Sequence, residues 1–127
     1  MKANELMIGD WVYRPNCYDR VKETRQNGII GLDSLHGLIG FSEIEPIPLT
    51  PEILEKNGFI GDKNVCKIKM RDDSKDELWQ CEYAWFLKNL RIKNHTNGSI
   101  ARLYDIMFVH ELQHTLRLCG IKKEIIL

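Results

Sequence analysis

The sequence has no long apolar segment, no excess of charge and no paired cysteine motif. None of its hydrophobic runs approaches the roughly 18 residues that a transmembrane helix requires. Eighteen basic residues balance eighteen acidic ones, so only local patches of charge can attract nucleic acid or a membrane. No C-x-x-C pair occurs among the four cysteines, which excludes zinc ribbons and thioredoxin-like motifs.

The sequence predicts neither a secretory leader nor a phosphate-binding loop. The opening MKANELMIGDWVY contains no apolar core of a signal peptide before Gly9 and Asp10. Several glycines lie between residues 28 and 40, but they have neither the spacing of a phosphate loop nor a helix pattern after them. We therefore expect a cytoplasmic protein without membrane association, whose thiols are reduced and mostly buried.

The first part of the chain has the pattern of a small β lobe. Hydrophobic residues make up 43% of the sequence and charged residues 28%, which is typical of a globular protein. Short apolar runs alternate with glycine and polar breaks and predict strands at 11–13, 20–24, 28–32 and 38–41. Glycines at the corners favour a curled, SH3-like lobe over residues 1–49.

Three prolines between residues 46 and 51 separate this lobe from a second one, residues 50–127. Thr50 as N-cap, Pro51 at the first helical position and Gly58 beyond the end predict a short helix over 51–57. Strands before and between helices indicate an α+β fold, and we expect the two lobes to form one compact folding unit.

Two antiparallel hairpins and a second helix complete the predicted second lobe. The hairpins join 65–70 to 77–83 and 85–92 to 99–104, the latter through the turn-forming Asn97-Gly98. Asp105 as N-cap and Gly120 as stop predict a helix from 106 to 119 that packs on the sheet. The tail IKKEIIL is consistent with a final short strand.

The sharpest chemical motif is H-E-x-x-H, formed by His110, Glu111 and His114 within FVHELQHTL. On a helix, histidines four residues apart share a face and can bind one zinc ion, while the glutamate polarises a bound water molecule. A zinc-dependent hydrolase with Glu111 as its catalytic residue is therefore one hypothesis.

Catalytic zinc needs a third protein ligand, and the sequence does not supply one in a known pattern. Arg117 and Gly120 stand where the extended metallopeptidase motif requires glycine and histidine. The acid Glu124 follows too closely to lie on a separate helix. His36 and His95 are upstream candidates in predicted loops, and neither belongs to a ligand motif.

The same helix can be interpreted through its two faces. Val109, Leu112 and Leu116 form an apolar stripe, and the opposite side is polar; its members are His110, Gln113, His114 and Arg117. An ordinary amphipathic helix explains the motif without metal. We accordingly predict no catalytic residue, no cofactor and no metal, with zinc at His110 and His114 as the alternative.

A second candidate site is the stretch from Tyr83 to Tyr104. It carries four cations and no acid after Glu82, with Trp85 and Phe86 nearby; the cations are Lys88, Arg91, Lys93 and Arg102. Basic, aromatic sheet faces bind single-stranded nucleic acid. Strand alternation sends Trp85 to the face opposite Phe86 and Lys88, so a solvated strand edge protected by lysine is the competing interpretation.

Aromatic residues of the first lobe and a late cysteine are weaker candidates. Trp11, Tyr13 and Tyr18 are interpreted either as core or as the lining of a peptide-binding groove. Cys119 lies near His114, but a thiol late in a helix gains no activation from the positive helix dipole. Nucleophilic catalysis is therefore not predicted.

Three stretches, MKANELMIGDWVY, EPIPLTPEILEKNGF and FVHELQHTLRLCG, resemble a family of short, uncharacterised proteins from Bacteroides-group bacteria and their phages and mobile elements. The family ending reads V-H-x-L-Q, which implies that His110, Leu112 and Gln113 are its helix signature and that Glu111 and His114 are not fixed. No activity is attached to the family. We predict a non-catalytic interaction module whose partner is a host or phage protein, with the zinc hydrolase and the nucleic-acid binder as alternatives.

Overall fold

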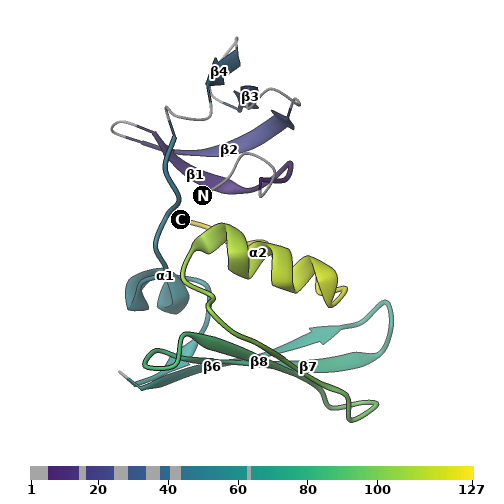
Figure 1. The fold of residues 1–127 in the computed structure, drawn as a ribbon. Coiled ribbons are helices and arrows are strands. Elements are labelled where there is room, and N and C mark those ends of the chain that lie inside the picture. The colour runs from purple at the N-terminus through teal and green to yellow at the C-terminus, as the bar shows by residue number, and fades with distance from the viewer. Residues whose placement is uncertain (1–5, 15–16, 25–28, 34–37, 41–43, 63) are drawn as a thin grey trace. The chain divides into compact units, whose positions relative to one another are not determined.

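The computed structural model describes residues 6–14, 17–24, 29–33, 38–40, 44–62 and 64–127 (Figure 1). Within these residues the fold is α+β, as predicted, with two antiparallel sheets and two helices. The chain divides into two compact units, residues 1–48 with 108–113, and residues 49–107 with 114–127. Unlike the predicted lobes, the first unit includes the start of the last helix.

Four short strands form the sheet of the first unit in the order of the sequence: β1 (Trp11–Arg14), β2 (Cys17–Thr24), β3 (Ile29–Leu32) and β4 (Leu38–Gly40). The predicted strands are therefore confirmed. Beyond β4 the chain returns to β1, where Tyr13 and Glu45 exchange backbone hydrogen bonds of 2.9 and 2.7 Å. The sheet is not closed in the described residues, so the SH3-like barrel is not confirmed.

Alternation along β1 and β2 builds the core of this unit. Val12 and Val21 point to the same side, and both are buried. Further apolar side chains from the flanking segments join them; this cluster consists of Leu6, Val12, Val21, Leu32 and Ile44. Trp11, Tyr13 and Tyr18 project to the opposite side of the two strands.

The second unit is built on a five-stranded antiparallel sheet, shown in part in Figure 1. Its strands follow one another in sequence order: β5 (Ile60–Gly61), β6 (Val65–Asp72), β7 (Glu77–Ala84), β8 (Asn89–Asn94) and β9 (Ile100–Leu103). Both predicted hairpins are confirmed. The prediction was wrong for 85–88, which form a turn in which Lys88 takes a left-handed conformation with φ of 51°.

Helix α1 (Pro51–Lys56) has the predicted capping. The Thr50 hydroxyl accepts a hydrogen bond from the Ile53 N–H at 3.2 Å, and Gly58 has a left-handed φ of 91°. Asn57, at the end of the helix, also holds the C-terminal tail. Its Nδ2 donates to the Ile126 carbonyl and its Oδ1 accepts from the Ile126 N–H, both at 2.8 Å.

The tail 121–127 is therefore not the strand that its apolar composition suggested. A single side chain satisfies the backbone of Ile126 in place of a neighbouring strand. Ile121 and Ile125 are buried, so the tail contributes to the core of the second unit.

Helix α2 (Val109–Leu118) begins three residues later than predicted. Residues 106 and 107 lie outside the helix, and their backbones pair with distant segments: the Ile106 N–H donates to the Lys88 carbonyl, and the Leu49 N–H donates to the Met107 carbonyl, both at 2.9 Å. Asp105, the predicted cap, has φ of 59° outside the helix. In the described part of the chain, no helix is both long and apolar enough to cross a membrane.

Candidate functional site

The H-E-x-x-H motif lies on α2, but its first histidine is not on an exposed polar face. His110 is only 1% exposed, and its ring stacks on Phe108 with centroids 5.8 Å apart. Gln113 is also buried; its Oε1 accepts from the Trp11 N–H and its Nε2 donates to the Gly9 carbonyl. The predicted solvated face is therefore wrong for these two residues, while His114 is half-buried.

Glu111 has a structural contact that explains its position in the motif. Its Oε1 accepts a hydrogen bond of 3.0 Å from the N–H of Phe108, the residue before the first helical residue. This is the glutamate half of a capping box, which satisfies a backbone donor at the start of a helix.

The zinc hypothesis gains no third ligand from the described residues. Among them, no three His, Cys, Asp or Glu side chains are grouped so that they can hold a metal ion. His36 lies outside the described residues. His95 lies 2.8 Å from the Gln80 side-chain oxygen on the sheet. The motif therefore has two histidines on one helix and no completed ligand set in the described chain.

Changing Glu111 to alanine is expected to destabilise the protein by about 0.5–2 kcal/mol, because the backbone N–H of Phe108, just before α2, loses its acceptor. Glu111→Gln should retain most of the stability, since glutamine serves the same capping function. Thermal unfolding with and without a zinc chelator measures both effects. Equal losses of stability in the two variants would contradict the capping role, and a loss that appears only with the chelator would indicate bound zinc.

Cys81 and Cys119, two thiols of the second unit, are not activated. Burial raises the pKa of Cys81 to about 12, and the nearby Cys119 adds to the rise. Burial also raises the pKa of Cys119. Because the thiolate is the nucleophilic form, neither cysteine is poised for catalysis at neutral pH. This agrees with the expectation that Cys119 is not a nucleophile.

One face of the five-stranded sheet carries a row of charged side chains. Strand register places Lys67 opposite Glu82, Glu82 opposite Arg91, and Arg91 opposite Arg102, so the row crosses β6, β7, β8 and β9. Residues that pair directly across strands project to the same face. Several of their neighbours in sequence, among them Cys81, Leu90 and Ile92, are buried on the other face.

A second row lies two residues along each strand. It consists of Lys69, Gln80, Lys93 and Ile100, paired in the same way across the four strands. The two rows together contain five cations and one carboxylate. We call the five cations, Lys67, Lys69, Arg91, Lys93 and Arg102, the basic sheet face.

Glu82 moderates the charge of the first row. Its carboxylate oxygens lie 3.8 Å from the Lys67 Nζ and 3.8 Å from the Arg91 Nη1. The Lys67 and Arg91 side chains remain 58% and 40% exposed, so these ion pairs are solvated and weak. Five positive charges and one negative charge leave the two rows with a formal charge of +4. A chain without net charge thus presents a local positive field.

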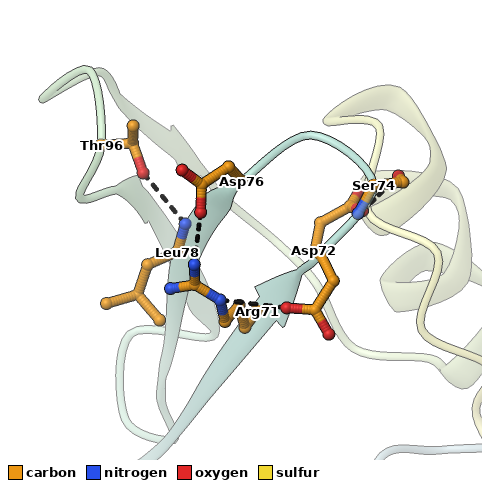
Figure 2. A network of polar contacts seen from close by, with 7 residues as sticks. Arg71, Asp72, Ser74, Asp76, Leu78 and Thr96 are labelled. Atoms are coloured by element: carbon orange, nitrogen blue, oxygen red, sulfur yellow. Dashed lines mark hydrogen bonds and ion pairs between the residues drawn. The ribbon is translucent and has the colours of Figure 1, made fainter.

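Arg71, two residues after Lys69 on β6, does not add a free cation to the basic sheet face. Arg71 is held by two carboxylates of the β6–β7 turn, with its Nε 3.0 Å from Asp73 and its Nη2 in contact with Asp76 (Figure 2). The same close-up shows the Leu78 N–H donating to the Thr96 hydroxyl, a bond of 3.1 Å that joins β7 to the turn between β8 and β9. The Arg71 charge is thus neutralised locally.

The structure brings together three of the four cations that the sequence singled out: Arg91, Lys93 and Arg102. The fourth, Lys88, lies in the β7–β8 turn with its Nζ 3.8 Å from the Met107 sulfur. Lys67 and Lys69 were missed. The alternation of lysine with apolar residues in KIKMR was the signal, but only the register with β7 shows that they join the same face.

The two aromatic residues in that stretch do not stack on the basic sheet face. Trp85 follows β7 and packs edge-to-face on the buried Tyr83 with centroids 4.7 Å apart, and its Nε1 lies 3.3 Å from the Cys66 sulfur. Phe86 is 93% exposed in the turn. Neither aromatic residue therefore belongs to the two rows of the basic sheet face.

In the first unit, aromatic side chains gather on one side of the β1–β2 hairpin. Tyr13 and Tyr18 are paired across the strands, with ring centroids 5.9 Å apart, and both are exposed. The Arg20 guanidinium lies 5.2 Å from the centre of the Trp11 ring. The two tyrosines are thus surface residues and not core.

Comparisons of this chain with protein-family models, with curated proteins and with solved structures gave no match. The resemblance to the Bacteroides-group family stays a prediction. The function has to be argued from the chemistry of the described surface.

Proposed function

We propose that this protein is a non-catalytic binding protein that holds the phosphate backbone of single-stranded nucleic acid on the basic sheet face. The observation that carries the proposal is the register of β6 to β9, which gathers five cations and one carboxylate in two adjacent rows. We place this activity in the cytoplasm, and the proposal needs neither metal nor cofactor.

The spacing of the cations suits a flexible polyanion. Neighbouring strands lie about 4.8 Å apart, and residues two positions apart on a strand lie about 7 Å apart. Several phosphates can therefore be neutralised at once, and each neutralised phosphate releases counterions. This release of counterions favours binding.

The width of the basic sheet face favours binding of a single strand over a duplex. Four strands span about 14 Å between the outer two, which is more than the roughly 12 Å width of the major groove of DNA. An open four-stranded face is instead suited to an unpaired strand that lies across it. Sequence preference is not expected from contacts to phosphate alone.

Binding of a fluorescent oligothymidylate should weaken steeply as salt rises. With five cations engaged, the slope of log affinity against log salt is expected to be about −3.5, which corresponds to a loss of about a hundredfold between 50 and 200 mM salt. Fluorescence anisotropy measures the affinity, with a duplex of equal length as the competitor. No binding at 50 mM salt, or binding that does not change with salt, would exclude the proposal.

The second candidate is the predicted module that binds a host or phage protein. Exposed Tyr13 and Tyr18 on the β1–β2 hairpin favour it, because aromatic side chains supply rigid, amphipathic contact area at interfaces. A protein retained from native lysate by the wild type and lost with Tyr13→Ala/Tyr18→Ala would support it. Equal retention by both would argue against this surface.

A further inference from the structure

A hollow of about 380 Å³ lies at one end of the basic sheet face. Its apolar lining includes Ala84, Leu87 and Tyr104, and its polar lining includes Glu82, Arg91 and Arg102. The volume falls within the roughly 300–1,000 Å³ range of small-molecule sites. The hollow is thus continuous with the first charged row.

Small side chains explain why the sheet is hollow here. The next row of this face begins with Val65, Ala84 and Asn89, which are paired across β6, β7 and β8. All three are shorter than the charged side chains beside them. Tyr104, two residues after Arg102 and 66% exposed, stands at the border of the hollow together with the exposed Leu87.

The chemistry of the lining is that of a site for a planar base next to a phosphate. Tyr104 offers an aromatic surface on which any base can stack. Arg91 and Arg102 are guanidinium groups that match phosphate oxygens, and Glu82 can accept a hydrogen bond from an amino group of a base. The lining of the hollow thus combines apolar side chains, an aromatic ring and flanking cations.

We infer that this hollow receives one unstacked base of a bound single strand, with the adjoining phosphates on Arg91 and Arg102. The inference rests on the proposed function and adds a preference for strands that carry bases. It also provides a reason for single strands to bind in preference to duplexes, since a paired base cannot enter the hollow.

The test compares two labelled strands with the same number of phosphates, an oligothymidylate and its abasic counterpart. Tyr104→Ala is expected to weaken binding of the oligothymidylate by about five- to a hundredfold, the usual effect of losing one stacked base. Binding of the abasic strand should not change. Tyr104→Phe should bind both strands like the wild type, because it keeps the ring.

Phe86→Ala is the matched control, because Phe86 is an exposed aromatic residue that does not line the hollow. Wild-type affinity for both strands in Tyr104→Ala would overturn the inference and leave the proposed function intact. Equal weakening of both strands would also overturn it, since it indicates a general effect on the sheet face. If the wild type binds neither strand at low salt, the proposed function itself fails.

Discussion

Alanine at both Lys69 and Lys93 is expected to weaken oligothymidylate binding by about fiftyfold at 50 mM salt. Each lysine is treated as one phosphate contact. The loss of two contacts should therefore reduce the slope of log affinity against log salt by about 1.4 in magnitude. These two lysines are the informative choice because the residue between them in the second row is the uncharged Gln80. Lys67 and Arg91, in contrast, share Glu82.

The matched control removes the same charge elsewhere. Lys56, in the last turn of α1, and Lys122, in the tail, are both exposed and neither belongs to the basic sheet face. Lys56→Ala/Lys122→Ala should bind the oligonucleotide nearly as well as the wild type. Equal losses in the two double variants would show that net charge, and not this sheet face, determines affinity.

Asn57→Ala is expected to lower the free energy of unfolding by about 2 kcal/mol, the cost of leaving polar groups without their partners. The buried Asn57 side chain makes three hydrogen bonds of 2.8 Å, to the carbonyl of Ile53 and to both backbone groups of Ile126. Without them the tail that carries the buried Ile121 and Ile125 loses its attachment to α1. Urea unfolding followed by circular dichroism measures the change.

Two further variants make the result specific. Asn57→Asp keeps an acceptor for the Ile126 N–H but brings a carboxylate against the Ile126 carbonyl, so it should be at least as destabilising as alanine. Asn64→Ala, at an exposed position, should change the stability by less than about 0.5 kcal/mol. An Asn57→Ala protein as stable as the wild type would show that solvent replaces the side chain at Ile126.

Local patterns were sufficient for most secondary-structure elements. Thr50, Pro51 and Gly58 are adjacent signals for the start and end of one helix, and α1 follows them. VCKIKM and ELWQCEY, on either side of the charged RDDSKD, likewise predicted β6 and β7, because two strands flank an exposed connection in a hairpin.

Predictions failed where a distant segment changes the local outcome. Residues 106 and 107 were expected to be helical, but their backbone groups are bonded to Lys88 and Leu49. His110 and Gln113 were placed on a solvated face because helical periodicity distinguishes only polar from apolar residues. Gln113 instead provides both partners for backbone groups of Trp11 and Gly9, which no pattern within the helix reveals.

The candidate site shows the same division. The sequence by itself determined the charges. It has no acidic residue between Glu82 and Tyr104, and it has lysines two positions apart at Lys67 and Lys69. Only the tertiary structure decided which of these cations share a surface, because strand register, and not distance along the chain, places Lys67 and Lys69 in rows with Arg91, Lys93 and Arg102. A shift of one residue in that register would send the lysines to the buried face.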